Sequence, residues 1–261
     1  MVTAEQLGYK HGEASVGEGS YIALRPQFDS ILSPAQILRK RLEELDALPK
    51  DKRWKKNDIG PWNSHFFGTS MGVAGTVLDL VLGPNSPALA ASTPDTPDSG
   101  IPMIAIPPTA KQYNREAYAR HINRPLLESE VPINPFWLEA AEGDSELLGQ
   151  LAQLTFRALR DVYHDDEGMG FHFPTDDEMT EGALVLDSTY GSANAGGDRY
   201  LGYGGARLVG VRRGAALVEA GKAVLPYTST DVEAAREQIE NLKKKVSPEE
   251  LTSLEALLKK L

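Results

Sequence analysis

The sequence TDVEAAREQIENLKKKVSPEELTSLEALLKKL, residues 230–261, carries the most regular pattern of the chain. A capping box, in which a Ser or Thr is followed three residues later by Glu, occurs twice, at Thr230 and at Ser247. After each box, apolar residues recur at alternating spacings of three and four, as they do along one narrow stripe of an amphipathic helix. These residues are Val232, Ala235, Ile239, Leu242, Val246, Leu251, Leu254, Leu258 and Leu261. The segment is therefore predicted to form two consecutive helices.

Two short helices with apolar stripes need a surface to pack on. That surface is the other helix, the body of the protein or another chain, and the sequence leaves these arrangements open. Because docking between subunits satisfies the pattern, we expect a homo-oligomer or a protein partner. The expected partner contacts are Val232, Ile239, Leu242, Val246, Leu251, Leu254 and Leu258.

Composition limits the classes of function. The chain has 261 residues, 41% of them hydrophobic, which is enough for one or two domains with a substantial core. A formal net charge of −10 argues against a broad nucleic-acid surface, and the lack of cysteine excludes disulfides and thiol chemistry. The N-terminal residues show no secretory signal, and the longest apolar stretch, residues 73–82, is too short for a membrane span. We expect a protein of the cytoplasm or of an assembled particle.

The predicted fold class is α+β, in four parts. Residues 1–82 are expected to be mainly helical, and residues 83–135 to form an extended proline-rich arm or linker, because proline fixes φ and removes a hydrogen-bond donor. Residues 136–228 are expected to hold a central helix and a small antiparallel glycine-rich β region. Residues 229–261 are the C-terminal helical pair.

Within these parts, the pattern predicts individual elements. Ser33 and Pro34 indicate the start of a helix that runs to about residue 47, and six apolar residues indicate a buried helix over residues 145–163. Strands are predicted for residues 21–25, 183–187, 206–212 and 215–225. The stretch 73–82 is the helix expected after the motif at Ser70.

That motif, Gly68-Thr69-Ser70-Met71-Gly72, matches the Gly-x-Ser-x-Gly nucleophile elbow, in which a strand-to-helix turn presents the serine oxygen. The candidate bases are His121, His164 and His172, and the candidate residues to orient the base are Asp161, Asp165 and Asp176. The hydrolase hypothesis takes Ser70, His164 and Asp165 as its catalytic set. The same five residues also fit a glycine-punctuated helix start with Ser70 near its N-cap.

Residues 163–178 concentrate acidic and imidazole side chains around two glycines. Hard divalent cations take oxygen ligands, so this stretch is a candidate site for Mg²⁺, Mn²⁺ or Ca²⁺. The candidate ligands are His164, Asp166, His172 and Asp176. The alternative is a solvated acidic loop, since the spacing matches no EF-hand and no helical zinc site.

Two further stretches have polar character. Residues 50–56 are basic and include Trp54, which indicates either an anion-binding patch with a stacking platform or a solvated loop. Residues 191–205 are glycine-rich but precede a predicted strand instead of a helix, which disfavours a phosphate cradle. They fit a hairpin tip or a subunit contact through Tyr200 and Tyr203 better.

Two classes of function follow from the sequence. The first is a non-catalytic structural or assembly subunit of a larger oligomer, for example a virion or particle component, with no cofactor, which docks through the C-terminal helices and the proline-rich arm. The second is a serine hydrolase that uses Ser70. A third hypothesis is a divalent-metal-dependent enzyme built on residues 164–178.

Overall fold

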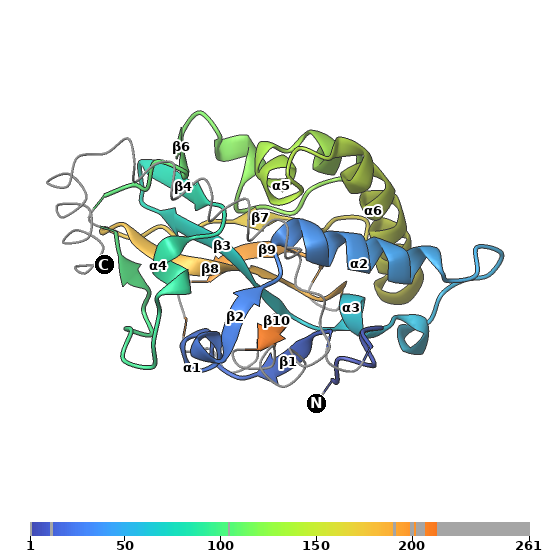
Figure 1. The fold of residues 1–261 in the computed structure, drawn as a ribbon. Coiled ribbons are helices and arrows are strands. Elements are labelled where there is room, and N and C mark those ends of the chain that lie inside the picture. The colour runs from blue at the N-terminus through green and yellow to red at the C-terminus, as the bar shows by residue number, and fades with distance from the viewer. Residues whose placement is uncertain are drawn as a thin grey trace, which may run out of the picture. The chain divides into compact units, whose positions relative to one another are not determined.

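Strand β3 (Phe67–Gly75) lies at the centre of a mixed sheet in the computed structural model (Figure 1). It pairs with β4 (Asp79–Gly83), β8 (Thr180–Leu186) and β10 (Arg207–Arg212). The structure describes residues 2–10, 13–103, 105–189, 192–198, 201 and 207–212, all of which belong to one compact unit, residues 1–213.

The ten described strands follow the order β1-β10-β3-β8-β9-β7, with β2 beside β10, β4 beside β3, β6 beside β4 and β5 beside β8. Two pairs, β3 with β10 and β7 with β9, are parallel, and the other pairs are antiparallel. The remaining strands are β1 (Ser15–Glu18), β2 (Phe28–Ile31), β5 (Ile101–Pro102), β6 (Lys111–Asn114), β7 (Phe171–His172) and β9 (Ala195–Asp198).

The sheet is covered on both faces, so neighbouring residues of one strand join different cores. Leu184 and Val209 belong to a large cluster that also contains the apolar side chains of α2, α5 and α6. Ala183 and Leu208 belong to a smaller cluster with side chains of α1 and α4. This double burial explains why β3 has eight buried residues and only Ser70 partly exposed.

Both long helices confirm the sequence prediction. In α2 (Pro34–Asp46) the Ser33 hydroxyl accepts from the Gln36 amide, and the Gln36 side chain accepts from the Ser33 amide, so the cap is reciprocal. Helix α6 (Ser145–Ala158) continues as the π-helical turn η5 (Leu159–Tyr163) and packs against α2. The shorter helices are α1 (Tyr21–Leu24), α3 (Pro61–Ser64), α4 (Pro87–Ala90) and α5 (Pro135–Ala140), with 3-10 turns η1 (Arg25–Gln27), η2 (Lys56–Asp58), η3 (Ala119–His121) and η4 (Glu128–Ile133).

The predicted fold class is wrong, because the N-terminal half is not mainly helical and the β region is not small. Four strands, β1 to β4, come from the first 83 residues. Strands β1, β2 and β3 pair with strands from the second half of the chain, and β4 pairs with β3 and β6. The helix predicted over residues 73–82 is a hairpin, in which Val73 lies opposite Leu82. A short apolar run fits a buried strand or a helix equally well, and here pairing with β8 decides for the strand.

Two strand predictions are confirmed, and one is wrong. Strands β8 and β10 lie where the sequence indicated strands at residues 183–187 and 206–212. Residues 21–25, predicted as a strand, instead form α1 and the start of η1, because Ser20 caps the helix by accepting from the Ala23 amide. In the glycine-rich stretch, residues 192–194 belong to the connection between the antiparallel strands β8 and β9, as a hairpin tip would, and β9 also pairs with β7.

The proline-rich stretch does not form an extended arm over the parts that the structure describes. After β4 the chain enters α4, whose Leu89 is buried in the smaller core. Strand β5 then pairs with β8, with Ile101 opposite Glu181, and β6 pairs with β4. The stretch therefore packs on the chain's own sheet.

The predicted C-terminal helices, the strand at residues 215–225 and the two tyrosines Tyr200 and Tyr203 lie outside the described residues. Among the helices that are described, none is both long and apolar enough to cross a membrane.

Candidate functional site

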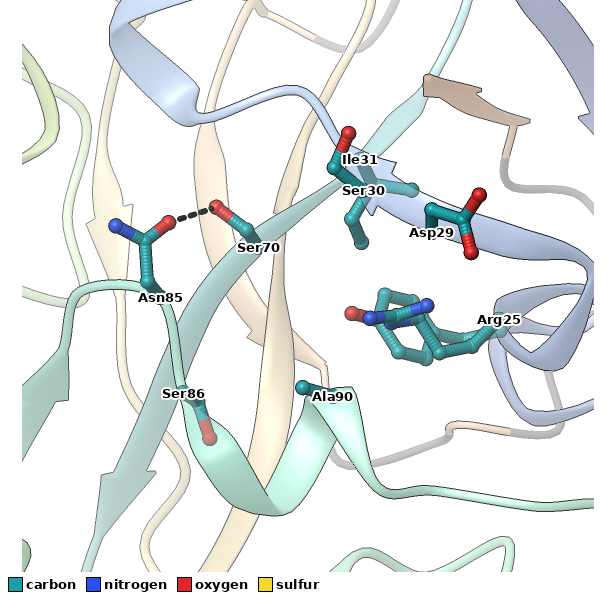
Figure 2. Close-up of a pocket in the computed structure, with 9 residues that line it drawn as sticks. Arg25, Asp29, Ser30, Ile31, Ser70, Asn85, Ser86 and Ala90 are labelled. Carbon is teal, nitrogen blue, oxygen red and sulfur yellow. Dashed lines mark hydrogen bonds between the residues drawn. The ribbon is translucent and has the colours of Figure 1, made fainter. Parts of the chain in front are cut away.

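A hollow of about 170 Å³ lies where β2, the middle of β3 and the start of α4 meet (Figure 2). We call it the Ser70 hollow. It is lined by Tyr21, Arg25, Asp29, Ser30, Ile31, Ser70, Asn85, Ser86 and Ala90. Figure 2 shows the Arg25 side chain reaching into the middle of the hollow, with Ser70 and Asn85 on the opposite side. The concentration of hydroxyl, amide and charged groups makes it the candidate functional site.

An irregularity in β3 directs Ser70 into this hollow. The pairing of β3 with β8 shifts register between Gly68 and Gly72, and Ser70 lies in the shifted part. Its backbone amide instead donates to the Leu32 carbonyl at 3.2 Å, and its carbonyl accepts from the Ser86 amide at 3.0 Å. The Ser70 hydroxyl donates to Asn85 Oδ1 at 3.0 Å. A β-bulge commonly turns a side chain away from its normal face, which is the result here.

The floor of the hollow is formed by two side chains of the α1–η1 segment. Arg25 is buried, with 7% of its surface exposed, and its Nη1 donates to the Phe28 carbonyl at 2.5 Å. The Tyr21 hydroxyl donates to the Thr69 carbonyl at 3.2 Å. Burial raises the pKa of Tyr21, an effect that the positive charge of Arg25 partly opposes. Tyr21 is therefore a neutral hydrogen-bonding group, and Arg25 supplies positive charge beside it.

A buried carboxylate lies next to this floor. Glu181 of β8 is 3% exposed and accepts a hydrogen bond from the Ser86 hydroxyl. Its carboxyl group occupies the space above Gly72, where an added Cβ would lie 1.6 Å from Glu181 Oε1. Burial raises the pKa of Glu181, and the hydrogen bond from Ser86 opposes that effect.

Replacing Glu181 by glutamine is expected to stabilise the protein at neutral pH. The folded-state pKa of Glu181 lies above its unfolded value, so the stability that the neutral form gives is complete below about pH 4.5 and is lost as the pH rises through the folded pKa. Glu181→Gln removes this loss. We expect the free energy of unfolding at pH 7 to rise by about 1 kcal/mol, which in a domain of this size raises the melting temperature by about 2–4 °C. Near pH 4 the variant and the parent protein should differ little.

Thermal unfolding of both proteins between pH 4 and pH 7 measures this effect. Glu178→Gln is the matched control, because Glu178 is exposed just before the same strand and should change little. A melting-temperature difference between Glu181→Gln and the parent protein that is constant over this pH range would contradict the assignment.

The structure does not place Ser70 at a strand-to-helix turn, since the whole motif from Gly68 to Gly72 lies inside β3. The histidines and aspartates of the hydrolase hypothesis have other partners. Arg53 Nη2 lies 3.1 Å from His164 Nδ1, and Arg120 Nε donates to His121 Nε2. Asp165 accepts from the Glu167 amide through Oδ1. Ser70 is brought together with Asn85 and not with these groups.

The four candidate metal ligands are also spread over several elements. His164 follows η5, His172 lies in β7, and the Asp176 side chain accepts from the Thr180 hydroxyl at 3.4 Å. Asp166 lies exposed in the loop after η5. Within the described residues, no three His, Asp or Glu side chains are grouped as metal ligands would be.

The basic run, residues 50–56, packs against the end of α6 and against η5. Trp54 is buried, and the Arg157 guanidinium lies over its indole ring, with Arg157 Cζ 4.4 Å from the ring centroid. Trp54 is therefore not a stacking platform for an outside ligand. The Trp54 amide donates to Asp161 Oδ2 at 3.0 Å, and Arg53 Nε donates to the Asp161 carbonyl at 2.8 Å. Residues 53 and 54 of the basic run are therefore held by hydrogen bonds to Asp161 of η5, whose carboxylate also pairs with Arg157.

Sequence reasoning found Ser70, but it missed Arg25, Tyr21 and Glu181. Arg25 lies before a proline in a stretch that resembled a strand end. Glu181 carried a usable signal, because it is an acidic residue directly before the apolar run Gly182–Leu186. A charged residue in a central strand needs a partner, and the Ser86 hydroxyl is that partner.

The described residues define a protein built on a mixed sheet, ten strands of which are described, with a small hollow on its surface. Comparison with protein-family models and with curated proteins gives no match. A solved structure from work on the accommodation of massive sequence variation in Nanoarchaeota by the C-type lectin fold is similar, with a TM-score of 0.49 and 13% sequence identity. The likeness covers 76% of this chain and 96% of that chain. At this level, the likeness carries no inference about function.

Proposed function

We propose that the chain is a non-catalytic structural or assembly subunit of a larger oligomer, such as a virion or other particle component, and that it docks on further copies of itself. The observation that carries this proposal is a rigid apolar tip on the sheet. Val77 and Leu78, between β3 and β4, have 61% and 68% of their surface exposed. Adjacent exposed apolar side chains on a fixed support favour binding to another protein.

The tip is held by hydrogen bonds from both sides. The Thr76 amide donates to the Asp79 carbonyl at 2.8 Å, and the Thr76 hydroxyl accepts from the Leu78 and Asp79 amides. Arg115 adds two bonds, from its amide to the Leu78 carbonyl and from Nε to the Thr76 carbonyl. Because the turn is already ordered, docking through it costs little conformational entropy.

The second support is the sequence pattern of residues 230–261. Its apolar stripes need a covering surface, and a second copy of the chain supplies an identical pair. Burying a large apolar side chain fully is worth about 1.5–3 kcal/mol, so a few stripe residues from each copy suffice for a stable contact.

The expected result of light scattering on a sizing column is a defined oligomer for the full chain and a monomer for a chain that ends at Thr228. Leu254→Gln with Leu258→Gln should also give a monomer, because both leucines belong to the stripe. Val77→Ser with Leu78→Ser should weaken the oligomer without changing the melting temperature of the body, because both side chains are exposed.

Thr252→Gln with Lys259→Gln is the matched control, since these positions lie on the other side of the same helical pattern, and this variant should keep the mass of the parent oligomer. If the full chain and the truncated chain both run as well-folded monomers, the assembly proposal fails.

A further inference from the structure

We propose that the Ser70 hollow binds a carboxylate group. The size of the hollow sets the first limit. At about 170 Å³ it is slightly larger than the engineered cavity of about 150 Å³ that admits one benzene molecule. Asp29, Ser30, Asn85 and Ala90 on its rim are exposed, so the hollow opens to solvent. An occupant of about six to nine non-hydrogen atoms, or the end of one side chain, therefore fits.

Arg25 makes the hollow selective for an anion. Its guanidinium is held in place by the bond from Nη1 to the Phe28 carbonyl, which uses one of the five N–H donors of the group. A buried arginine that is already oriented loses little entropy when it binds a ligand. Because the guanidinium reaches into the middle of the hollow, an acceptor that enters from solvent meets it directly (Figure 2).

The surrounding charges favour a planar monoanion over phosphate. Glu181 lies behind Ser86. Its carboxylate repels an incoming anion, and the repulsion is about twice as large for a phosphate dianion as for a carboxylate. A guanidinium also matches the two oxygens of a carboxylate with two parallel N–H bonds.

Neutral groups opposite Arg25 complete the site. The hydroxyl of Ser70 and the amide of Asn85 bond to each other on the far side of the hollow. Asn85 has a positive φ of 49°, a conformation that asparagine adopts more readily than most residues, and its side chain is held by the hydrogen bond from the Ser70 hydroxyl. The pair can rearrange to bond a second polar group of the ligand.

The carboxylate can belong to a free small acid or to an acidic side chain of a bound protein. Both sources share the chemistry that Arg25 recognises. The inference does not depend on the assembly proposal, because the hollow is formed entirely by residues of the described body.

The test uses the full ¹⁵N-labelled chain and NMR titration with benzoate, with benzamide as the neutral ligand of the same shape. We expect benzoate to bind with a dissociation constant of about 1 mM or tighter, a reasonable affinity for nine non-hydrogen atoms. Backbone amide signals of residues 29–31, 70, 85 and 86 should shift. Benzamide should bind at least about tenfold more weakly. Absence of saturable benzoate shifts at these residues would overturn the proposal.

Arg25→Gln should weaken benzoate binding at least about tenfold, whereas Arg39→Gln should leave it unchanged. Arg39 is a partly exposed arginine of α2, 3.9 Å from Asp144, and lies outside the hollow. If Arg25→Gln does not fold, Arg25→Lys keeps the positive charge but loses the planar pair of N–H donors, so it should also weaken benzoate binding. Unchanged affinity in whichever Arg25 variant folds would contradict the site.

A second titration separates the two sources of carboxylate. Acetyl-Gly-Glu-Gly-amide and acetyl-Gly-Gln-Gly-amide differ only in the charged group. If the glutamate peptide binds at least as tightly as benzoate and the glutamine peptide does not bind, the site takes a partner's acidic side chain. If only benzoate binds, the site takes a free small acid. If the glutamine peptide binds as well as the glutamate peptide, carboxylate recognition is contradicted.

Discussion

Gly210→Ala is expected to cost about 3 kcal/mol of stability or more, or to prevent folding. Gly210 lies in β10 between two antiparallel neighbours, opposite Ser15 of β1 and Ile31 of β2. A Cβ at this position would lie 1.9 Å from the Ser30 carbonyl oxygen and 2.8 Å from the Ile31 Cα. Both are backbone atoms, so no side-chain rotation relieves the clash, and β2 must move away from β10.

This movement would also damage the Ser70 hollow, because β2 supplies Asp29, Ser30 and Ile31 to its wall. Chemical denaturation followed by circular dichroism measures the loss. Gly196→Ala is the matched control, since Gly196 also lies in a strand, β9, and its added Cβ would meet no atom within 4 Å. A Gly210→Ala protein within about 0.5 kcal/mol of the parent would show that β2 does not lie this close to β10.

The elements that could be predicted are those whose pattern is local. The capping box at Ser33 and the apolar spacing of α6 are complete within a few turns, so the sequence specifies both helices. Strand β3 could not be recognised in this way. Its glycines at positions 68, 72 and 75 are typical of turns in a single sequence, but in the fold they lie where Leu208, Glu181 and the Pro174 carbonyl come close. Those neighbours are more than 90 residues away in the chain.

In the candidate site too, the sequence predicts what a local pattern specifies and misses what depends on distant parts of the chain. Ser70 was recognisable because a short motif surrounds it, but the motif predicted a strand-to-helix turn that the chain does not make. The bulge that exposes Ser70 depends on bonds to Leu32 and Ser86, which come from separate parts of the chain. Arg25 had no motif of its own, and only the packing of α1 against the sheet brings it to Ser70. The residues of the site come from three separate stretches of the chain, residues 21–31, Ser70 and residues 85–90.

Arg41→Met is expected to lower stability by about 3–5 kcal/mol, although methionine fills a similar volume. Arg41 of α2 is 3% exposed and donates to three backbone carbonyls, those of Trp62, His65 and Leu186. These bonds tie α2 to the segment before β3 and to the end of β8. Burial lowers the pKa of Arg41 to about 10, with Asp187 and Glu44 opposing that effect, so the group stays charged at neutral pH.

The substitution removes the charge but leaves the carbonyls without their donor, and each buried unsatisfied group costs about 1–3 kcal/mol. Denaturant unfolding of Arg41→Met and Arg39→Met compares two arginines of the same helix. Arg39 is about half exposed, and its contact with Asp144 is long, at 3.9 Å, so Arg39→Met should change stability by less than about 0.5 kcal/mol. If the two variants are equally stable, water satisfies the three carbonyls, and the helix is held to the sheet by its apolar face alone.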